Sequence, residues 1–358
     1  MARNILKSNN AIVGVQNSTS AFFTSNIDLN LYNFVQSCDY SVSFSRQNTK
    51  QLGAKNYAST DIFSQPDVQL DLSYILEPEL QNEYHGCFCQ TSVHRFVPMF
   101  SGYLDANTNF YVLNAPNQED DAIDSVNLGS TLDLVGWEGI AFGNCFPSSY
   151  NLSYSIGLFP TVSTSYICSN MKYEDLTGTS MQSPAINLES GNNNEVGLCV
   201  FNFDNGKTKP EIPNPSRPSS TVNLENLQVG GQRLSGTHFI QSVDMSVSLD
   251  RVSNYGLGSD FAYGRKALLP AQGTFSVSSL VSGFDDGQIT GVLKNNSSYD
   301  FDLTLATSGD KKIIYQIEDA QLTSYNYSMP INGQMSFDAQ FSFEVTDTKG
   351  LKISGSSY

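Results

Sequence analysis

The side chains best suited to bind a metal ion gather in one short segment. They are two histidines and two cysteines, in the order His85, Cys87, Cys89 and His94. Structural zinc sites use two pairs of such ligands at defined spacings, and the chain offers no second pair. A Cys-x-Cys pair on an extended strand also has a structural explanation, because alternate residues share one face. We interpret the cluster as structural and keep a metal site as the alternative.

Other chemical signatures are incomplete. Asp285, Asp286 and Gly287 have the order of half a calcium-binding loop, but the later ligands are missing and a hairpin turn explains the triplet better. Motifs of nucleophilic hydrolases, phosphate-binding loops and dinucleotide-binding domains are absent. Scattered Asp and Glu leave a hydrolase open without favouring one. The sequence therefore names no catalytic, cofactor-binding or metal-binding residue, and we expect a protein that is not an enzyme.

The elements that would position any site are strands, and one strand sequence occurs twice. Residues 34–53 align without a gap with residues 239–258, 205 positions later, and ten of the twenty residues are identical. A tandem duplication of one fold explains this repeat. In both copies apolar side chains alternate with small polar ones, which is the period of an antiparallel strand with one buried side. The polar side carries Ser37, Asp39, Ser41, Ser43 and Ser45, then Ser242, Asp244, Ser246, Ser248 and Asp250.

A second, fainter repeat relates residues 150–153 to residues 325–328, with Ile156 over Ile331.

Polar loops are expected at about 47–66 and 252–270, and a short helix at 119–126. Trp137 lies in an apolar stretch and is expected in the core. Further strands are expected near residues 68–76, 199–203, 275–281, 301–305, 313–317 and 337–345.

These patterns predict an all-β fold with minor helix, made of two tandem antiparallel β-sandwich or barrel-like domains. The length of 358 residues agrees with about two domains. Pro, Gly and Asn concentrate between the two copies and indicate a linker or insertion. The expected boundaries are an N-terminal arm at 1–30, a first domain at 31–173, a linker or insertion at 174–235 and a second domain at 236–358.

Composition and charge narrow the function. The net charge is −16, and a polyanion does not bind nucleic acid by neutralising phosphates. Charged residues make up 15%, against a typical ~25%, so neutral polar residues cover much of the surface. The apolar run at 11–15 is too short for a signal peptide core, and no run is long enough to span a membrane. We expect a protein made in the cytoplasm, with free thiols and no membrane partner.

The second copy resembles the tail tube proteins of long-tailed bacteriophages. The resemblance rests on the strand at 239–248, Leu257 and Gly258, the loop to Pro270 with its following strand, and the C-terminal hairpin. It is clearest over 237–355 and weaker over 31–170. The long insertion between the copies and the segment 84–106 depart from a minimal tube domain.

This resemblance implies a structural virion protein whose rings stack into a hollow tail tube that conducts DNA during ejection. Three chains with two similar domains each would form a pseudo-sixfold ring. The implied partners are further copies of this chain, other tail proteins, and viral DNA that passes without specific binding; assembly would occur in the cytoplasm of the host bacterium. The polar loops and the N-terminal arm are candidates for ring-to-ring contacts. Candidates for the channel lining are Ser41, Ser43, Asp244 and Ser246.

Two alternatives remain beside the tail tube. One is a tail-tip or baseplate component with the same fold. The other is a secreted or surface carbohydrate-binding β-sandwich, which calls for exposed aromatic side chains in a groove.

Overall fold

The protein is built almost entirely from β-strands, which confirms the all-β expectation. The described part of this computed structural model contains one short helix, α1 (Gln81–His85). The expected helix at 119–126 lies outside the described residues. The structure describes residues 11–17, 27–44, 46–49, 52–53, 55, 59–62, 67–86, 88, 96–100, 108–115, 136–175, 180–182, 184, 198–200, 220–224, 228–229, 232–233, 240–254, 262, 264–280, 298–307, 311–331 and 333–355.

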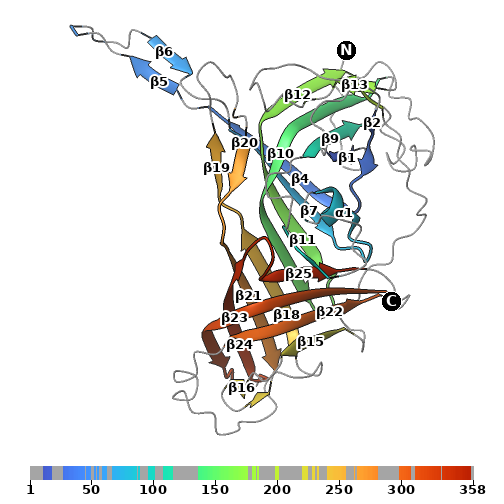
Figure 1. Cartoon of the computed structure of the whole chain (residues 1–358), viewed down its shortest axis with the longest axis vertical. Helices are drawn as coiled ribbons and strands as arrows, with labels where there is room; N and C mark the ends of the chain where they lie inside the picture. Colours follow the sequence, from blue (N-terminus) through green and yellow to red (C-terminus); the bar gives the residue numbers. More distant parts are fainter. Residues whose placement is uncertain are drawn as a thin grey trace.

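Alternating apolar and polar residues produce a large main sheet whose long strands run through the molecule (Figure 1). Its neighbours along the main path are all antiparallel. In order, the path consists of β15 (Thr221–Leu224), β22 (Tyr299–Ala306), β23 (Lys312–Ser328), β24 (Ser336–Val345), β21 (Ala271–Leu280), β18 (Ile240–Ser248), β10 (Glu138–Ser155), β11 (Thr161–Cys168), β7 (Asp67–Ile75) and β4 (Val35–Ser43).

The two longest strands, β10 and β23, each belong to two layers. Their later residues lie in the main path, while their first halves pair with strands of a second layer. Each bends at a residue with positive φ, Asn144 at 48° and Asp319 at 56°, and such irregularities bend a strand. Near β10 the second layer contains β1 (Ala11–Asn17), β3 (Asn30–Leu31), β9 (Thr108–Asn114) and β12 (Asn170–Asp175). Near β23 it contains β25 (Leu351–Ser354) and β8 (Val97–Pro98), together with β22 and β15, which begin the path given above.

Small sheets surround this framework. The expected polar loops contain two hairpins, and the one made of β5 and β6 extends away from the body (Figure 1). β14 confirms the start of the strand predicted at 199–203, and residues 201–203 lie outside the described residues. These sheets consist of β5 (Arg46–Thr49) with β6 (Ser59–Ile62), β19 (Arg251–Asn254) with β20 (Gly264–Ala267), β16 (Gln228–Val229) with β17 (Gln232–Arg233), and β13 (Ser180–Gln182) with β14 (Leu198–Val200) and β2 (Ile27–Asp28).

Strands that align in the sequence repeat pair in the same register. Cys38 faces Leu72 between β4 and β7, and Val243 faces Val277 between β18 and β21; both members of the second pair lie 205 positions later. A register irregularity also falls at the same place, between Val35 and Ser37 in β4 and between the residues 205 positions later, 240 and 242, in β18. The two segments therefore have equal local geometry.

One continuous hydrophobic core joins both halves of the chain. Its largest fully buried side chains are aromatic and come from both halves; Tyr150 and Tyr315 share a hydroxyl hydrogen bond of 2.8 Å. Trp137 is 5% exposed, as expected for a core residue. Because β10 pairs with β18, the main sheet also runs on across the expected boundary at 174–235. The domain limits stay a prediction.

Candidate functional site

The structure describes only part of the suspected metal cluster. Cys87, Cys89 and His94 lie outside the described residues, as do Asp285 and Asp286. His85 ends α1 against the ring of Tyr84, and burial lowers its pKa to about 4. Among the residues that are described, no group of three or more His, Cys, Asp or Glu side chains is placed to hold a metal ion. Among the described cysteines, Cys38, Cys145 and Cys168 are not joined in disulfides.

The feature that unites both halves is the polar face, the side of the main sheet opposite the core, from β4 to β23. The four residues predicted for a channel lining all lie on it, because each pairs with a polar residue on the neighbouring strand. Ser41, Ser43 and Asp244 are exposed, and Ser246 is half-buried. One row across this face consists of Ser73, Ser163, Asn151, Ser246, Thr274 and Ser342.

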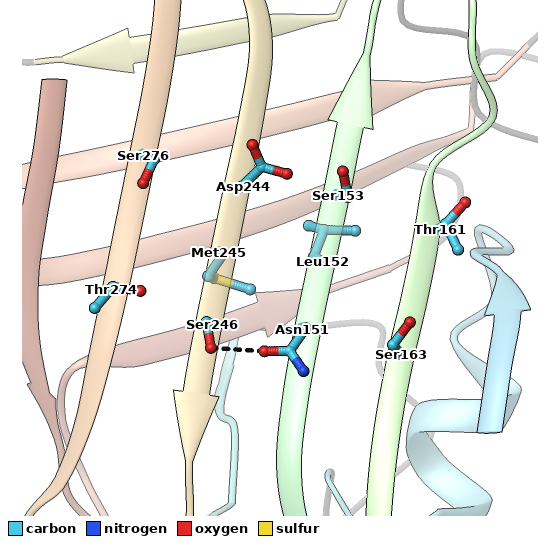
Figure 2. A pocket seen from close by; sticks show the side chains of 10 residues that line it. All are labelled: Asn151, Leu152, Ser153, Thr161, Ser163, Asp244, Met245, Ser246, Thr274 and Ser276. Atoms are coloured by element: carbon cyan, nitrogen blue, oxygen red, sulfur yellow. Dashed lines mark hydrogen bonds between the residues drawn. The ribbon is translucent and has the colours of Figure 1, made fainter. Parts of the chain in front are cut away.

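A groove lies at the middle of the polar face, where β10 meets β18. Figure 2 shows its lining side chains on four neighbouring strands, and its volume is about 260 Å³. The Ser246 hydroxyl donates a hydrogen bond of 2.6 Å to Oδ1 of Asn151 across the junction. The lining is made of hydroxyl, amide and carboxylate groups with two apolar residues: Asn151, Leu152, Ser153, Thr161, Ser163, Asp244, Met245, Ser246, Thr274 and Ser276.

The strands that carry the polar face contain no lysine, arginine or histidine. This holds for β4, β7, β11, β18, β21 and β24, for residues 149–155 of β10 and for residues 321–328 of β23. Carboxylates are the only charged groups there, so every formal charge on these strands is negative. They belong to Asp39, Asp67, Asp71, Asp244, Asp338 and Glu344.

The polar face ends at two strand edges. Among the described strands β4 is hydrogen-bonded only to β7, and residues 321–328 of β23 only to β24. Such edges present unpaired N–H and C=O groups and are open to pairing with another chain. The apolar side of β4 is only partly covered, since Tyr40 is 42% and Phe44, just after the strand, 54% exposed. The two edges and the face between them form the candidate functional site.

The two hairpins predicted as loops lie next to this site. Each follows an equivalent strand, because β5 and β6 align with β19 and β20 at the same offset of 205 residues. Arg251 joins the second hairpin to β10: its Nε donates to the carbonyl oxygen of Pro147 at 2.6 Å, and it lies over the Phe146 ring. The sequence indicated polar segments here but not their pairing.

A buried carboxylate inside the core was missed from the sequence. Glu83, on α1, is fully buried and accepts hydrogen bonds from the hydroxyls of Tyr74 (2.8 Å) and Tyr150 (3.3 Å). Burial raises the pKa of Glu83 to about 7, and the Tyr74 hydrogen bond opposes this shift. A substrate has no access to a carboxylate that is 0% exposed. The only signal in the sequence was a glutamate four residues before the Cys-x-Cys pair, which does not predict burial.

Comparison with known proteins identifies no family for this chain. No protein-family model matches the chain, and no curated protein matches it. Within the described residues, no helix is long and apolar enough to cross a membrane.

Proposed function

We propose that the chain is a structural virion protein of a phage tail tube. Copies of it form rings, three chains to a pseudo-sixfold ring, and the rings stack into a tube. The polar face lines the central channel, and DNA slides along it without specific binding. The hairpins β5–β6 and β19–β20 contact the next ring.

The polar face without any cation carries this proposal. DNA is held to proteins chiefly by Lys and Arg at its phosphates, and the strands of this face offer neither. Carboxylates such as Asp244 repel phosphates, and hydroxyls keep the wall hydrated. At physiological salt the repulsion reaches about 8 Å, so it acts only on DNA close to the wall. This arrangement suits passage rather than binding.

The groove gives less support to a carbohydrate-binding protein. Sugar sites stack their ligand on aromatic rings, and no aromatic residue lines this groove among the described side chains. The exposed aromatic residues Tyr40 and Phe44 lie instead on the opposite side of β4, at the edge of the sheet. Their position at a strand edge favours contact with another protein chain over stacking against a sugar.

Electron microscopy of the concentrated, purified protein tests the proposal. We expect rings or tubes with a central hole, and sedimentation with short DNA duplexes should leave the DNA in the supernatant. Rings of Asp244→Lys should retain DNA at low salt and release it as salt rises, because each added cation contributes a salt-dependent phosphate contact. The matched control is Asp347→Lys, an exposed turn outside the polar face. Compact monomers at all concentrations, or equal DNA retention by both variants, would contradict the proposal.

A further inference from the structure

We propose that β23 pairs with β4 of a second copy of this chain, in the antiparallel register in which β10 pairs with β18 inside one chain. The inference rests on the proposed ring and adds to it the partner strand and the residues that face each other. It turns the β10–β18 contact, which we call the internal junction, into a template for the contact between chains.

The strands at the two edges match the strands of the internal junction. β4 aligns with β18 at an offset of 205 residues, and β23 aligns with β10 at an offset of 175 residues. The offset of 175 also relates their irregularities: β10 shifts register between Pro147 and Ser149, and β23 between Leu322 and Ser324. Each edge therefore has the backbone shape of its counterpart.

Apolar side chains at the two edges are more exposed than their equivalents at the internal junction, as expected for strands that lack a partner. Met245 on β18 is 1% exposed and Leu249, just after the strand, 2%. The residues 205 positions earlier, Tyr40 on β4 and Phe44 just after it, are 42% and 54% exposed. On the other side, Tyr154 of β10 is 7% exposed, but Met329, 175 positions later, is 60% exposed. These three equivalent apolar positions are thus covered at the internal junction and more exposed at the edges.

The template fixes the register between the chains. At the internal junction Asn151 faces Ser246. Adding 175 to the first number and subtracting 205 from the second places Asn326 opposite Ser41. The Ser246–Asn151 hydrogen bond of 2.6 Å then has its counterpart between the Ser41 hydroxyl and the Asn326 side chain. The same shift places Ser324 opposite Ser43, Ser328 opposite Asp39 and Tyr327 opposite Tyr40.

An arginine supports the same register. Arg251 follows β18 and donates to the carbonyl oxygen of Pro147 at the internal junction. Its equivalent is Arg46, which is exposed at the start of β5. In the proposed contact Arg46 reaches the carbonyl oxygen of Leu322, the equivalent of Pro147, on the second copy.

The contact is head-to-tail because the two edges differ. A chain offers β4 on one side and β23 on the other, so each added copy leaves one edge of each kind. Such a heterologous contact gives a ring when the rotation closes and an open filament when it does not. A closed ring leaves no edge unpaired.

Disulfide trapping tests the register. Ser41→Cys with Asn326→Cys places two thiols on facing positions of different chains, where cross-strand Cβ atoms lie close enough to bond. Ser43→Cys with Asn326→Cys is the matched control, with the same face and strands but a shift of two residues. Asp39→Cys with Ser328→Cys provides a second facing pair. Burial raises the pKa of the edge thiol Cys38 to about 12, which keeps its own background reaction low.

After mild oxidation we expect a ladder of covalent multimers from both facing pairs, at least about tenfold above the shifted pair. Mixing chains that carry only Ser41→Cys with chains that carry only Asn326→Cys should give dimers, and neither alone should. Dimers from Ser41→Cys alone would show β4 pairing with itself and overturn the inference. Rings in the microscope without these cross-links overturn the pairing and leave the ring proposal standing. Cross-links without rings support the pairing and reject the ring.

Discussion

Glu83 is an ionisable residue that is fully buried in the hydrophobic core. Its carboxylate accepts hydrogen bonds from Tyr74 and Tyr150 of the main sheet. The hydroxyl of Tyr150 is also hydrogen-bonded to the hydroxyl of Tyr315, in the second half of the chain. The Oε2 atom of Glu83 has no hydrogen-bond partner in the described structure. A buried acid with one unsatisfied oxygen is more stable protonated, and this explains the direction of its pKa shift.

Glu83 should therefore make a contribution to stability that falls as pH rises from about 4.5 to about 7, while His85, whose pKa burial lowers, makes a contribution that rises over a similar range. The folded state holds the Glu83 proton up to about pH 7, whereas the reference value for a free glutamate is 4.5. Between these values the unfolded chain loses a proton that the folded chain keeps, so unfolding becomes easier. The shift corresponds to about 3 kcal/mol.

The variant Glu83→Gln should remove this loss. We expect the unfolding midpoint of the variant to rise relative to that of the wild type as pH increases across that window, and to exceed it at pH 8. Glu79→Gln is the control, because Glu79 is a partly exposed ion-pair partner of Lys311 and should keep the wild-type slope. A wild-type slope in Glu83→Gln would show that burial does not shift this acid.

Among the elements, β21 and β24 pair like β7 and β11 of the first half but carry side chains of different size at one facing position. Gly273 faces Phe343 between β21 and β24, while Val68 faces Cys168 between β7 and β11, the positions 205 and 175 residues earlier. A large ring opposite glycine replaces two side chains of medium size. The total volume is thus kept, which is the change that cores tolerate best.

Gly273→Ala should destabilise the protein by about 1–3 kcal/mol, since the added Cβ overpacks the strand pair. That atom would lie 2.3 Å from the Phe343 ring, so the ring has to leave its position. Gly264→Ala is the control in β20, the preceding strand in the sequence, where the closest atom is 3.9 Å away. Unfolding midpoints of the two variants measure the difference; equal midpoints would mean that the ring moves without cost.

At this scale the sequence predicts strands well and their partners poorly. The period of two identified β4 and β18, because one buried side selects every second residue. The ladder inside the loop at 47–66 was missed, since its residues lack the apolar alternation on which the prediction depends. α1 was also missed, because five residues at 81–85 are too few to show a helical period. The pairing of β10 with β18 depends on contacts between distant segments, which local patterns do not contain.

For the whole molecule, the main sheet gathers strand segments without Lys, Arg or His into one surface, the polar face. The sequence showed a net charge of −16 but not where the cations are missing. The sheet brings eight cation-free strand segments into one continuous surface, and only their order in space makes that surface visible. The candidate lining residues were predicted from the alternation in two strands; the groove and the two edges required the sheet.

The orientation of the polar face in an assembled particle tests the central claim most directly. A density map of the purified assembly, at a resolution that separates strands, measures which side of the main sheet faces the hole. We expect one unbroken sheet around the channel, with Asp244 and Ser246 toward the centre and with strands pairing across every chain boundary. A map in which this face points outward, or in which the sheets of neighbouring chains do not join, would contradict the account.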